Sequence, residues 1–449
     1  MFRSAIWLIL SQIIVLSSIP YLARAYSVEE FSYFAIFSAF FVLSSKVCNL
    51  RLPDAIVVEK KENLSKLIIS IYFVVILFSL FFSLLYAMFD GIFSFNNYII
   101  IFLATVCITQ VQIRNFLDIR EKKYGRASMW FALVNILTVA FQILLSTTKT
   151  GLIYGQLLAI LMVSILTFPL CYKYCKKFTY LDLIAIVKLN RKFAIYLTLY
   201  SLVAGLKSKF IYFILANGSY NGVLSQAERI SNAPNTLISS VIRPVIYSTF
   251  NSETIKKEGE KVLGGLMFLI IISSVPLLYA LNYYIEDVVL LVLGEQWLEY
   301  HEIFFMAAVS AVIMLLTNWM DKIFDLLHRQ QVFLIIELCF LPIYIISIYI
   351  AYQVYGDQIA VMTYLVLNSI LSITWLFVIY YLCGFGIKML SYRMFLIVLY
   401  AVVFVIVVGA LPVIFEEVYL ITMFAVLYLL SLVVTYRKLA LRYWVKKYI

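Results

Sequence analysis

Residues 67–89 read LIISIYFVVILFSLFFSLLYAMF and hold no charged side chain. At about 1.5 Å of rise per residue, a helix of this length crosses the roughly 30 Å hydrocarbon core of a bilayer. The whole chain has the same character, since 64% of its 449 residues are hydrophobic and 13% are charged, with a mean hydropathy of +0.99. So few polar side chains cannot cover a water-soluble protein, which excludes a cytosolic enzyme and a secreted module.

Apolar segments of this kind recur along the whole chain, with short loops between them. They predict an all-α integral membrane protein with about fourteen transmembrane helices, or twelve as the alternative. The predicted segments are 4–22, 31–50, 67–89, 97–117, 125–146, 151–172, 192–216, 221–249, 262–282, 302–326, 332–354, 358–382, 394–415 and 418–436. One longer outward connection, 283–301, is acidic and is expected to lie on the membrane surface.

The loops alternate sharply in positive charge. On this map nearly all Lys and Arg residues fall on one side of the membrane, while Arg24 and Lys149 fall on the other. Because Lys and Arg are retained on the cytoplasmic side, both termini are predicted to be cytoplasmic. The same bias explains the excess of 35 Lys and Arg over 24 Asp and Glu, so no nucleic-acid partner is expected.

A weak internal repeat separates two halves. The distance from Phe31 to Arg51 equals that from Val223 to Arg243, and a Pro follows two residues or one residue later. Two halves of six helices share one orientation, as in parallel repeats related by an axis along the membrane normal. The predicted division is an N-terminal lobe at 1–190, a C-terminal lobe at 191–390, and two extra helices with a basic tail at 391–449.

Four cations fall inside predicted helices rather than in loops: Lys207, Lys209, Arg229 and Arg243. A charged group at membrane depth costs at least about 2.5–3.5 kcal/mol, so it usually faces a polar interior. Polar positions at three- and four-residue steps predict one polar face of the eighth helix. They are Gln226, Arg229, Asn232, Thr236, Ser240 and Arg243.

The hairpin of the seventh and eighth helices places Lys209 level with Glu228 and Arg229, so these groups are expected to meet. The excess of positive charge suits an anionic ligand such as a diphosphate, with Arg229 and one of Lys207 and Lys209 lining its site. Two alternatives stay open. Glu228 could simply pair with one of these cations while the others snorkel to the interface, or it could take up a proton and serve in coupling.

Enzymatic chemistry finds little support in the sequence. The two histidines, His301 and His328, lie at opposite faces of the map, and no carboxylate cluster or metal-ligand spacing accompanies them. A Walker-type phosphate-binding loop is also missing from the sequence, so ATP is not expected to drive the protein directly. No enzyme activity, cofactor or metal is predicted.

Several stretches resemble the polysaccharide transporter family, the oligosaccharide-lipid flippases within the multidrug/oligosaccharidyl-lipid/polysaccharide exporter superfamily. They are YLARAYSVEEFSYFAIF from Tyr21, LRLPDAIVVEKKENLSKL from Leu50, NGVLSQAERISNAPNTLISSVIRPVIYSTF from Asn221, LVLGEQW from Leu291 and DLLHRQQ from Asp325. The resemblance implies two six-helix lobes, often with two further helices, in a bacterial inner membrane. It also implies a cationic central cavity that accepts the diphosphate and sugars of an undecaprenyl-linked repeat unit.

The predicted function is therefore export of a lipid-linked oligosaccharide for O-antigen, capsule or exopolysaccharide by alternating access. Its predicted site combines Arg229, Lys207 or Lys209, Gln226 and Asn232, with Arg24 and Arg51 at the mouths of the cavity. Membrane lipids, a polysaccharide polymerase and chain-length proteins are the expected partners. The first helix has no charge between Arg3 and Arg24, which favours the O-unit or capsule branch over the peptidoglycan-precursor branch. The rival readings are an ion-coupled multidrug antiporter and a multipass polymerase or acyltransferase.

Overall fold

The computed structural model describes residues 2–89, 95–172, 180–215, 218–236, 238–239, 242, 246, 250, 252–320, 323–324, 327 and 329–410. Over these residues the chain is helical with short connections and has no strand, which confirms the predicted all-α membrane fold. Eleven helices in this part are long and apolar enough to cross a membrane. The predicted segment 418–436 and the basic tail lie outside the described residues.

The chain forms two compact units. The first comprises Met1–Gln226, Val292–Trp297 and Leu334–Thr363, and the second comprises Ala227–Leu291, Leu298–Phe333 and Tyr364–Ile449. These units do not coincide with the lobes 1–190 and 191–390 expected from the repeat, so that division and its axis stay predictions.

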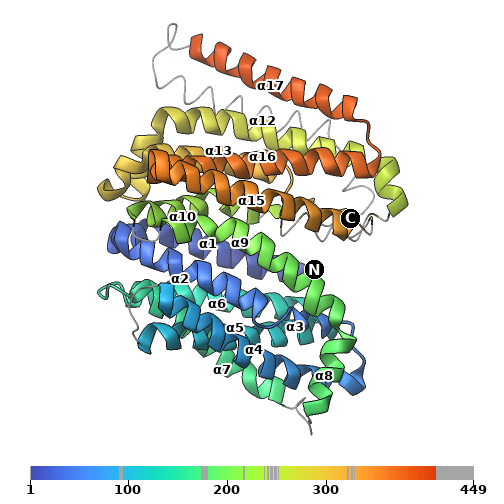
Figure 1. Cartoon of the computed structure of the whole chain (residues 1–449). Coiled ribbons are helices and arrows are strands. Elements are labelled where there is room, and N and C mark those ends of the chain that lie inside the picture. The colour runs from blue at the N-terminus through green and yellow to red at the C-terminus, as the bar shows by residue number, and fades with distance from the viewer. Residues whose placement is uncertain are drawn as a thin grey trace. The chain divides into compact units, whose positions relative to one another are not determined.

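Most long helices of the first unit coincide with predicted apolar segments, whereas the short α3 and α8 match none of them (Figure 1). They are α1 (Phe2–Ala25), α2 (Val28–Val47), α3 (Leu52–Ala55), α4 (Lys61–Phe89), α5 (Phe95–Arg120), α6 (Tyr124–Leu144), α7 (Gly151–Tyr172), α8 (Tyr180–Leu189), one π-helical turn (Lys192–Leu197), α9 (Thr198–Ile214), α10 (Ser219–Ser231) and α15 (Gln330–Tyr355). Helix α5 packs on α4, α6 and α7, and its buried Ile101 and Val111 join Phe37 and Ile160 in a core. Buried polar side chains also join these helices, since the hydroxyls of Ser44 in α2 and Thr105 in α5 are hydrogen-bonded at 2.7 Å.

Helix α2 begins at a capping box written in the sequence SVEE. Ser27 Oγ accepts a hydrogen bond from the Glu30 backbone N–H, and Glu30 accepts one from the Ser27 N–H at 2.8 Å. The two bonds satisfy donors that a helix N-terminus leaves free. One turn further, Ser32 Oγ accepts the N–H of Gly222 at 2.8 Å, so the start of α10 packs directly on α2.

The second unit contains α12 (Ser252–Val292), a 3₁₀ turn (Glu295–Tyr300), α13 (His301–Leu315), α16 (Asp357–Cys383) and α17 (Ile387–Ala410), some of which extend into the first unit. Tyr284 leaves helical geometry at φ −112° and ψ 21°. The predicted outward connection 283–301 is thus mostly helical, with a kink at Tyr284, and its expected place on the membrane surface stays a prediction. Asn235 Nδ2 donates to the Ala311 carbonyl oxygen at 3.0 Å, and the rings of Phe333 and Trp375 stack with centroids 4.3 Å apart.

The predicted eighth segment, 221–249, is not one straight helix. Helix α10 ends at Ser231, Asn232 lies in a turn, and residues 233–236 are again helical. Pro234 follows this turn by two residues. A proline has no backbone N–H to donate to the carbonyl oxygen four residues earlier, which accounts for the break. Polar residues beside the break therefore find partners outside their own helix.

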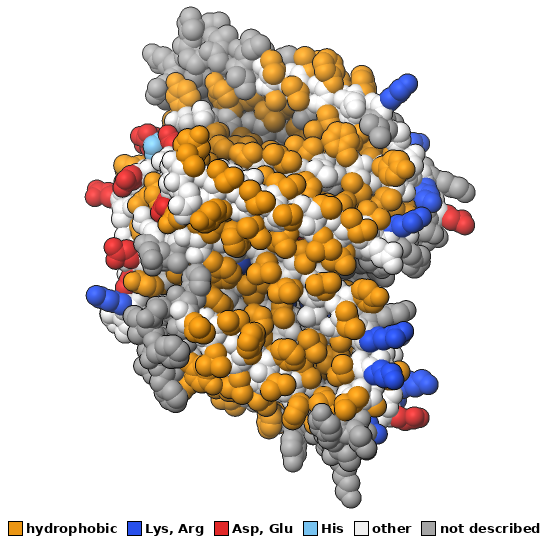
Figure 2. All heavy atoms as spheres, in the orientation of Figure 1, with side chains coloured by type: hydrophobic (Ala, Val, Ile, Leu, Met, Phe, Trp, Pro, Cys, Tyr) orange, Lys and Arg blue, Asp and Glu red, His pale blue; other side chains and the backbone are white. Residues whose placement is uncertain are grey.

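Hydrophobic side chains cover the long faces of the helices in Figure 2. In the first unit, Lys and Arg side chains gather near α3 and α8, at one end of the helices. Exposed members of this group are Lys60, Lys61, Lys122, Lys123 and Lys188. The positive-inside rule assigns such an end to the cytoplasm, and the sidedness itself stays a prediction.

Candidate functional site

Lys207 is held inside the first unit by a carboxylate. Its Nζ lies 2.6 Å from Glu337 Oε2 of α15, and the two side chains keep only 9% and 5% of their exposure. The same ammonium lies 5.5 Å from the ring centre of Tyr344, two turns along α15. Lys207 is therefore neutralised in this structure rather than open to an anion.

Lys209 takes a different environment. It is half-buried, and its Nζ lies 4.7 Å from the ring centre of Tyr212, three residues along α9. Lys207 and Lys209 are two residues apart on α9 and so lie on different faces of the helix, which agrees with these separate surroundings. Aromatic contact of this kind stabilises a cation without neutralising its charge.

Glu228 and Arg229 belong to the second unit, at the end of α10. Glu228 Oε1 accepts a hydrogen bond from Tyr364 Oη at 2.7 Å. Arg229 is half-buried and makes no ion pair within the described residues. The alternative in which Glu228 neutralises Arg229 therefore finds no support in the contacts of the second unit.

The expected meeting of Lys209 with Glu228 and Arg229 would join the two units, and it stays a prediction. Of the polar face, Gln226 is 1% exposed and neither end of its amide has a hydrogen-bond partner in the described part of the chain. Asn232 Oδ1 accepts a bond from Asn235 Nδ2 at 3.1 Å, beside the break after α10. Ser240 and Arg243 lie outside the described residues.

The two residues predicted at the mouths lie at helix ends. Arg24, in the last turn of α1, is exposed, and the aliphatic part of its side chain lies beside Gly294. Arg51 has a left-handed backbone with φ 52° and precedes α3. Its Nη2 lies 3.1 Å from Asp54 Oδ1, and its side chain keeps 33% exposure. Each position is reachable by a ligand, but neither residue is shown to bind one.

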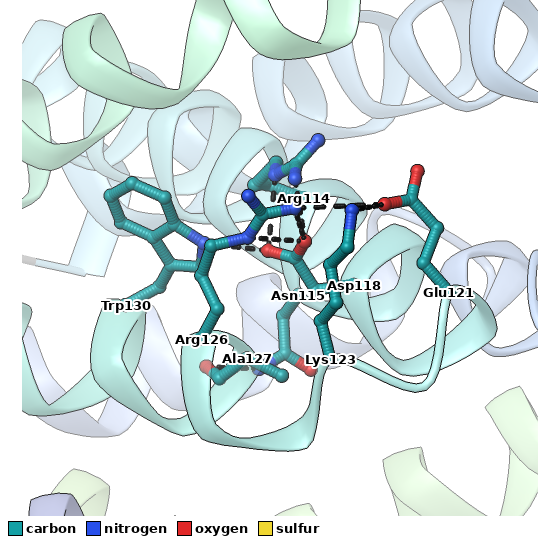
Figure 3. A network of polar contacts seen from close by, with 8 residues as sticks. All are labelled: Arg114, Asn115, Asp118, Glu121, Lys123, Arg126, Ala127 and Trp130. Carbon is teal, nitrogen blue, oxygen red and sulfur yellow. Dashed lines mark hydrogen bonds and ion pairs between the residues drawn. The ribbon is translucent and has the colours of Figure 1, made fainter.

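A second buried charge cluster joins α5 and α6 (Figure 3). The fully buried Asp118 carboxylate accepts from Arg114 Nε at 3.1 Å, Arg126 Nε at 2.8 Å and Trp130 Nε1 at 2.9 Å. Asn115 Nδ2 also donates to the Ala127 carbonyl oxygen at 2.8 Å. These bonds fix the turn between the two helices, so this cluster serves structure.

The sequence analysis did not predict a role for two buried acidic residues, Glu337 and Asp118. Glu337 is a lone carboxylate within the apolar run IIELCF of a predicted span, and that isolation was the signal that could have found it. The sequence predicted three cations and one carboxylate, Glu228, around the anion site. Glu337 is a second carboxylate and pairs with Lys207, so the predicted positive excess is smaller. Asp118 directly follows the predicted span 97–117, in a stretch rich in Lys and Arg. Nothing in that sequence indicates that its carboxylate is buried.

The fold and these residues define a multi-pass membrane protein with charged side chains buried inside apolar helices. Such charges commonly mark the pathway of a polar substrate or an ion. A family model described as "Polysaccharide biosynthesis protein" matches residues 21–302. The protein belongs to this family. The predicted family resemblance is thereby confirmed.

Among solved structures, the chain is similar to a lipid II flippase, MurJ, in an inward closed conformation. The TM-score is 0.69 at 14% identity, over 97% of this chain and 99% of that chain. At this identity the likeness concerns the fold alone. The Vibrio cholerae MATE transporter VcmN gives a TM-score of 0.39 at 12% identity, over 85% of this chain and 94% of that chain, which is too low to support an argument. A comparison with curated proteins gives no match.

Proposed function

We propose that this protein is a flippase for an undecaprenyl-diphosphate-linked oligosaccharide, which it moves from the cytoplasmic to the outer leaflet by alternating access. The family supports a polysaccharide precursor as the cargo. The fold of a lipid flippase supports movement of a lipid-linked molecule across the membrane. The repeat unit would be that of an O-antigen, a capsule or an exopolysaccharide, in a bacterial inner membrane with both termini cytoplasmic.

The observation that carries this proposal is the state of Arg229. It lies in the predicted span 221–249, is half-buried, and has no carboxylate partner within the described residues. A guanidinium without a counter-ion at membrane depth is costly unless water or an anion reaches it. Its planar fork of donors matches phosphate oxygens, so a diphosphate is the ligand that suits it.

Lys209 would supply the second charge of this anion site, while Gln226 and Asn232 would contact sugar or phosphate oxygens. Glu228, held by Tyr364 at 2.7 Å, would respond to the charge of the cargo and so assist coupling. A multidrug antiporter for cationic drugs would favour acidic lining instead, which these residues do not supply. Neither a polymerase nor an acyltransferase role gains support from them.

The test is a leaflet assay in reconstituted vesicles. A labelled diphosphate-linked oligosaccharide is incorporated, and its arrival in the far leaflet is followed for the wild type and for Arg229→Glu. Loss of translocation is expected because the anion site becomes repulsive, whereas Arg229→Lys should retain part of the rate. Arg191→Glu provides the same charge reversal on an exposed arginine outside the proposed site.

Normal translocation by Arg229→Glu would remove the anion site from Arg229. Absence of translocation by the wild type, together with transport of a cationic dye, would favour the antiporter instead. Membrane insertion of each variant is measured by its yield in the membrane fraction, so that loss of function is separated from loss of folding.

A further inference from the structure

The ion pair of Lys207 and Glu337 connects two spanning helices of the first unit, α9 and α15. Both side chains are almost completely buried, with Nζ and Oε2 at 2.6 Å. The ammonium of Lys207 also lies 5.5 Å from the ring centre of Tyr344. Lys207 therefore contacts one face of α15, since Glu337 and Tyr344 are seven residues apart, close to two helical turns.

Such a pair is poorly explained by stability alone. Removing two charges from water is expensive, and a pair of apolar side chains of similar volume often stabilises a buried site equally well or better. In apolar spanning helices, ionisable groups commonly mark the pathway of a substrate or a proton. The burial and the position of the pair therefore call for a role in transport.

We propose that Glu337 is an internal counter-ion that occupies Lys207 in the empty transporter, and that the diphosphate of the cargo displaces it. This inference rests on the proposed function, because it assigns Lys207 to the same anionic headgroup. A diphosphate carries more negative charge than a carboxylate and offers more acceptor oxygens, so it competes well for the ammonium. Small singly charged anions compete poorly, which keeps them out of the site.

Displacement leaves Glu337 buried beside a multiply charged anion. A carboxylate that loses its cation in a low-dielectric site is strongly disfavoured in its ionised form. It therefore takes up one proton when the cargo binds, and it returns the proton when the pair forms again. Binding of the diphosphate is thus linked to uptake of one proton at Glu337.

Few other titratable groups face this pair in the described part of the chain. On α9 and α15 the groups concerned are Lys207, Glu337 and Tyr344. Helix α2, which packs on α9, carries Lys46 in its last turn, and a lysine is already protonated at neutral pH under ordinary conditions. A tyrosine does not titrate near neutral pH under ordinary conditions. A proton taken up between about pH 6 and pH 8 is therefore assigned to Glu337 or to the bound phosphate.

The test measures binding of a short-chain isoprenyl diphosphate to the purified full-length protein in detergent between about pH 6 and pH 8. For the wild type, affinity should rise as the pH falls, by up to about tenfold per pH unit for one proton. Glu337→Gln should bind about tenfold more tightly at the higher pH, with only the pH dependence of the probe itself. Because both proteins share that probe, their difference reports Glu337.

Two further variants keep the test decisive. Lys207→Gln/Glu337→Gln removes both charges, which avoids a lone buried charge, and should bind the probe more weakly than Glu337→Gln. Glu260→Gln makes the same chemical change in a carboxylate paired with Arg393 of α17, and should keep the wild-type pH profile. Thermal stability is recorded for every variant.

The outcomes separate the two proposals. If the wild type neither binds the diphosphate nor translocates lipid-linked cargo, the proposed function itself fails. If the wild type does both, but Glu337→Gln has the wild-type affinity and pH profile, only the counter-ion role is overturned. A loss of thermal stability in Glu337→Gln without any change in binding also overturns it, since the pair would then serve packing alone.

Discussion

Trp297 donates its indole N–H to the carbonyl oxygen of Ala23 at 2.9 Å, although 274 residues separate the two. Gln296 adds a bond to the Tyr26 carbonyl oxygen at 3.0 Å. The fully buried Trp297 ring also meets Phe31 edge-on, with centroids 5.4 Å apart. The segment Val292–Trp297 thereby satisfies carbonyl groups that the end of α1 leaves without helical partners.

Trp297→Phe should test this contact with a smaller loss of volume than Trp297→Ala. It removes the hydrogen bond, worth about 0.5–1.5 kcal/mol, and leaves a smaller cavity, so the free energy of unfolding should fall by less than in Trp297→Ala. Trp297→Ala should lower it by about 3–5 kcal/mol because a cavity also forms. Thermal unfolding in detergent measures both values. The exposed Tyr355→Phe serves as the control, and equal melting of Trp297→Ala and wild type would contradict the prediction.

Asp118→Asn should be severely destabilising. The fully buried carboxylate is shared by Arg114, whose side chain is 2% exposed, and by Arg126. Removing its charge leaves a buried guanidinium without compensation, at a cost of about 3–5 kcal/mol. Reduced membrane yield and a lower melting temperature are expected.

The exposed pair of Lys123 and Glu121 gives the matched control. Their atoms lie 2.6 Å apart, but the lysine side chain is 52% exposed. Lys123→Ala should change stability by at most about 1 kcal/mol. A comparable loss in Lys123→Ala and Asp118→Asn would mean that burial of the Asp118 cluster is unimportant.

Local composition was enough to predict most of the fold. An apolar run such as 67–89 has few alternatives to a spanning helix, because unsatisfied backbone groups are not tolerated in lipid. The turn at Asn232 is harder to predict from the sequence, although Pro234 favours a bend nearby. How far each helix extends depends on capping and on packing partners elsewhere in the chain, as the continuation of α12 to Val292 shows.

The candidate site was harder to predict because its contacts are distant in sequence. Lys207 could be placed inside a helix, but its partner Glu337 lies 130 positions further along the chain, on a different helix. A single sequence gives the position of each charge along its own helix and not which helices become neighbours. The roles of Arg24, Arg51, Arg229, Gln226 and Asn232 accordingly stay predictions.

Acid should weaken the hydrogen bond from Asn190 Nδ2, just after α8, to Glu59 Oε2 at 2.9 Å. Both residues lie outside the membrane-spanning helices. Burial tends to raise the pKa of Glu59, but hydrogen bonds from Asn190, Asn63 and the Lys60 N–H, with the charge of Arg120, lower that pKa below 4.5. A lowered pKa in the folded protein stabilises it above the ordinary value, and this contribution is lost as the pH falls through the lowered pKa.

Thermal stability should therefore be compared between wild type and Glu59→Gln from about pH 6 down to about pH 4. The wild type should be more stable at the higher pH, and the difference should shrink as the pH falls. Glu62→Gln changes an exposed carboxylate one turn away and should leave the wild-type profile intact. A constant difference across this range would exclude ionised Glu59 as the source of stability.

Gly222 should tolerate no side chain, because α10 begins in direct contact with α2. An added Cβ would lie 2.3 Å from the Val28 carbonyl oxygen and 2.9 Å from the Ser32 backbone nitrogen. Both are backbone atoms that cannot rotate away, so the helices must separate and the bond from the Gly222 N–H to Ser32 Oγ is lost. Gly222→Ala should lower stability by about 1–3 kcal/mol. Gly386→Ala, where a Cβ meets no atom within 4 Å, should be neutral in the same thermal unfolding assay, and similar losses in both variants would refute close packing of α2 and α10.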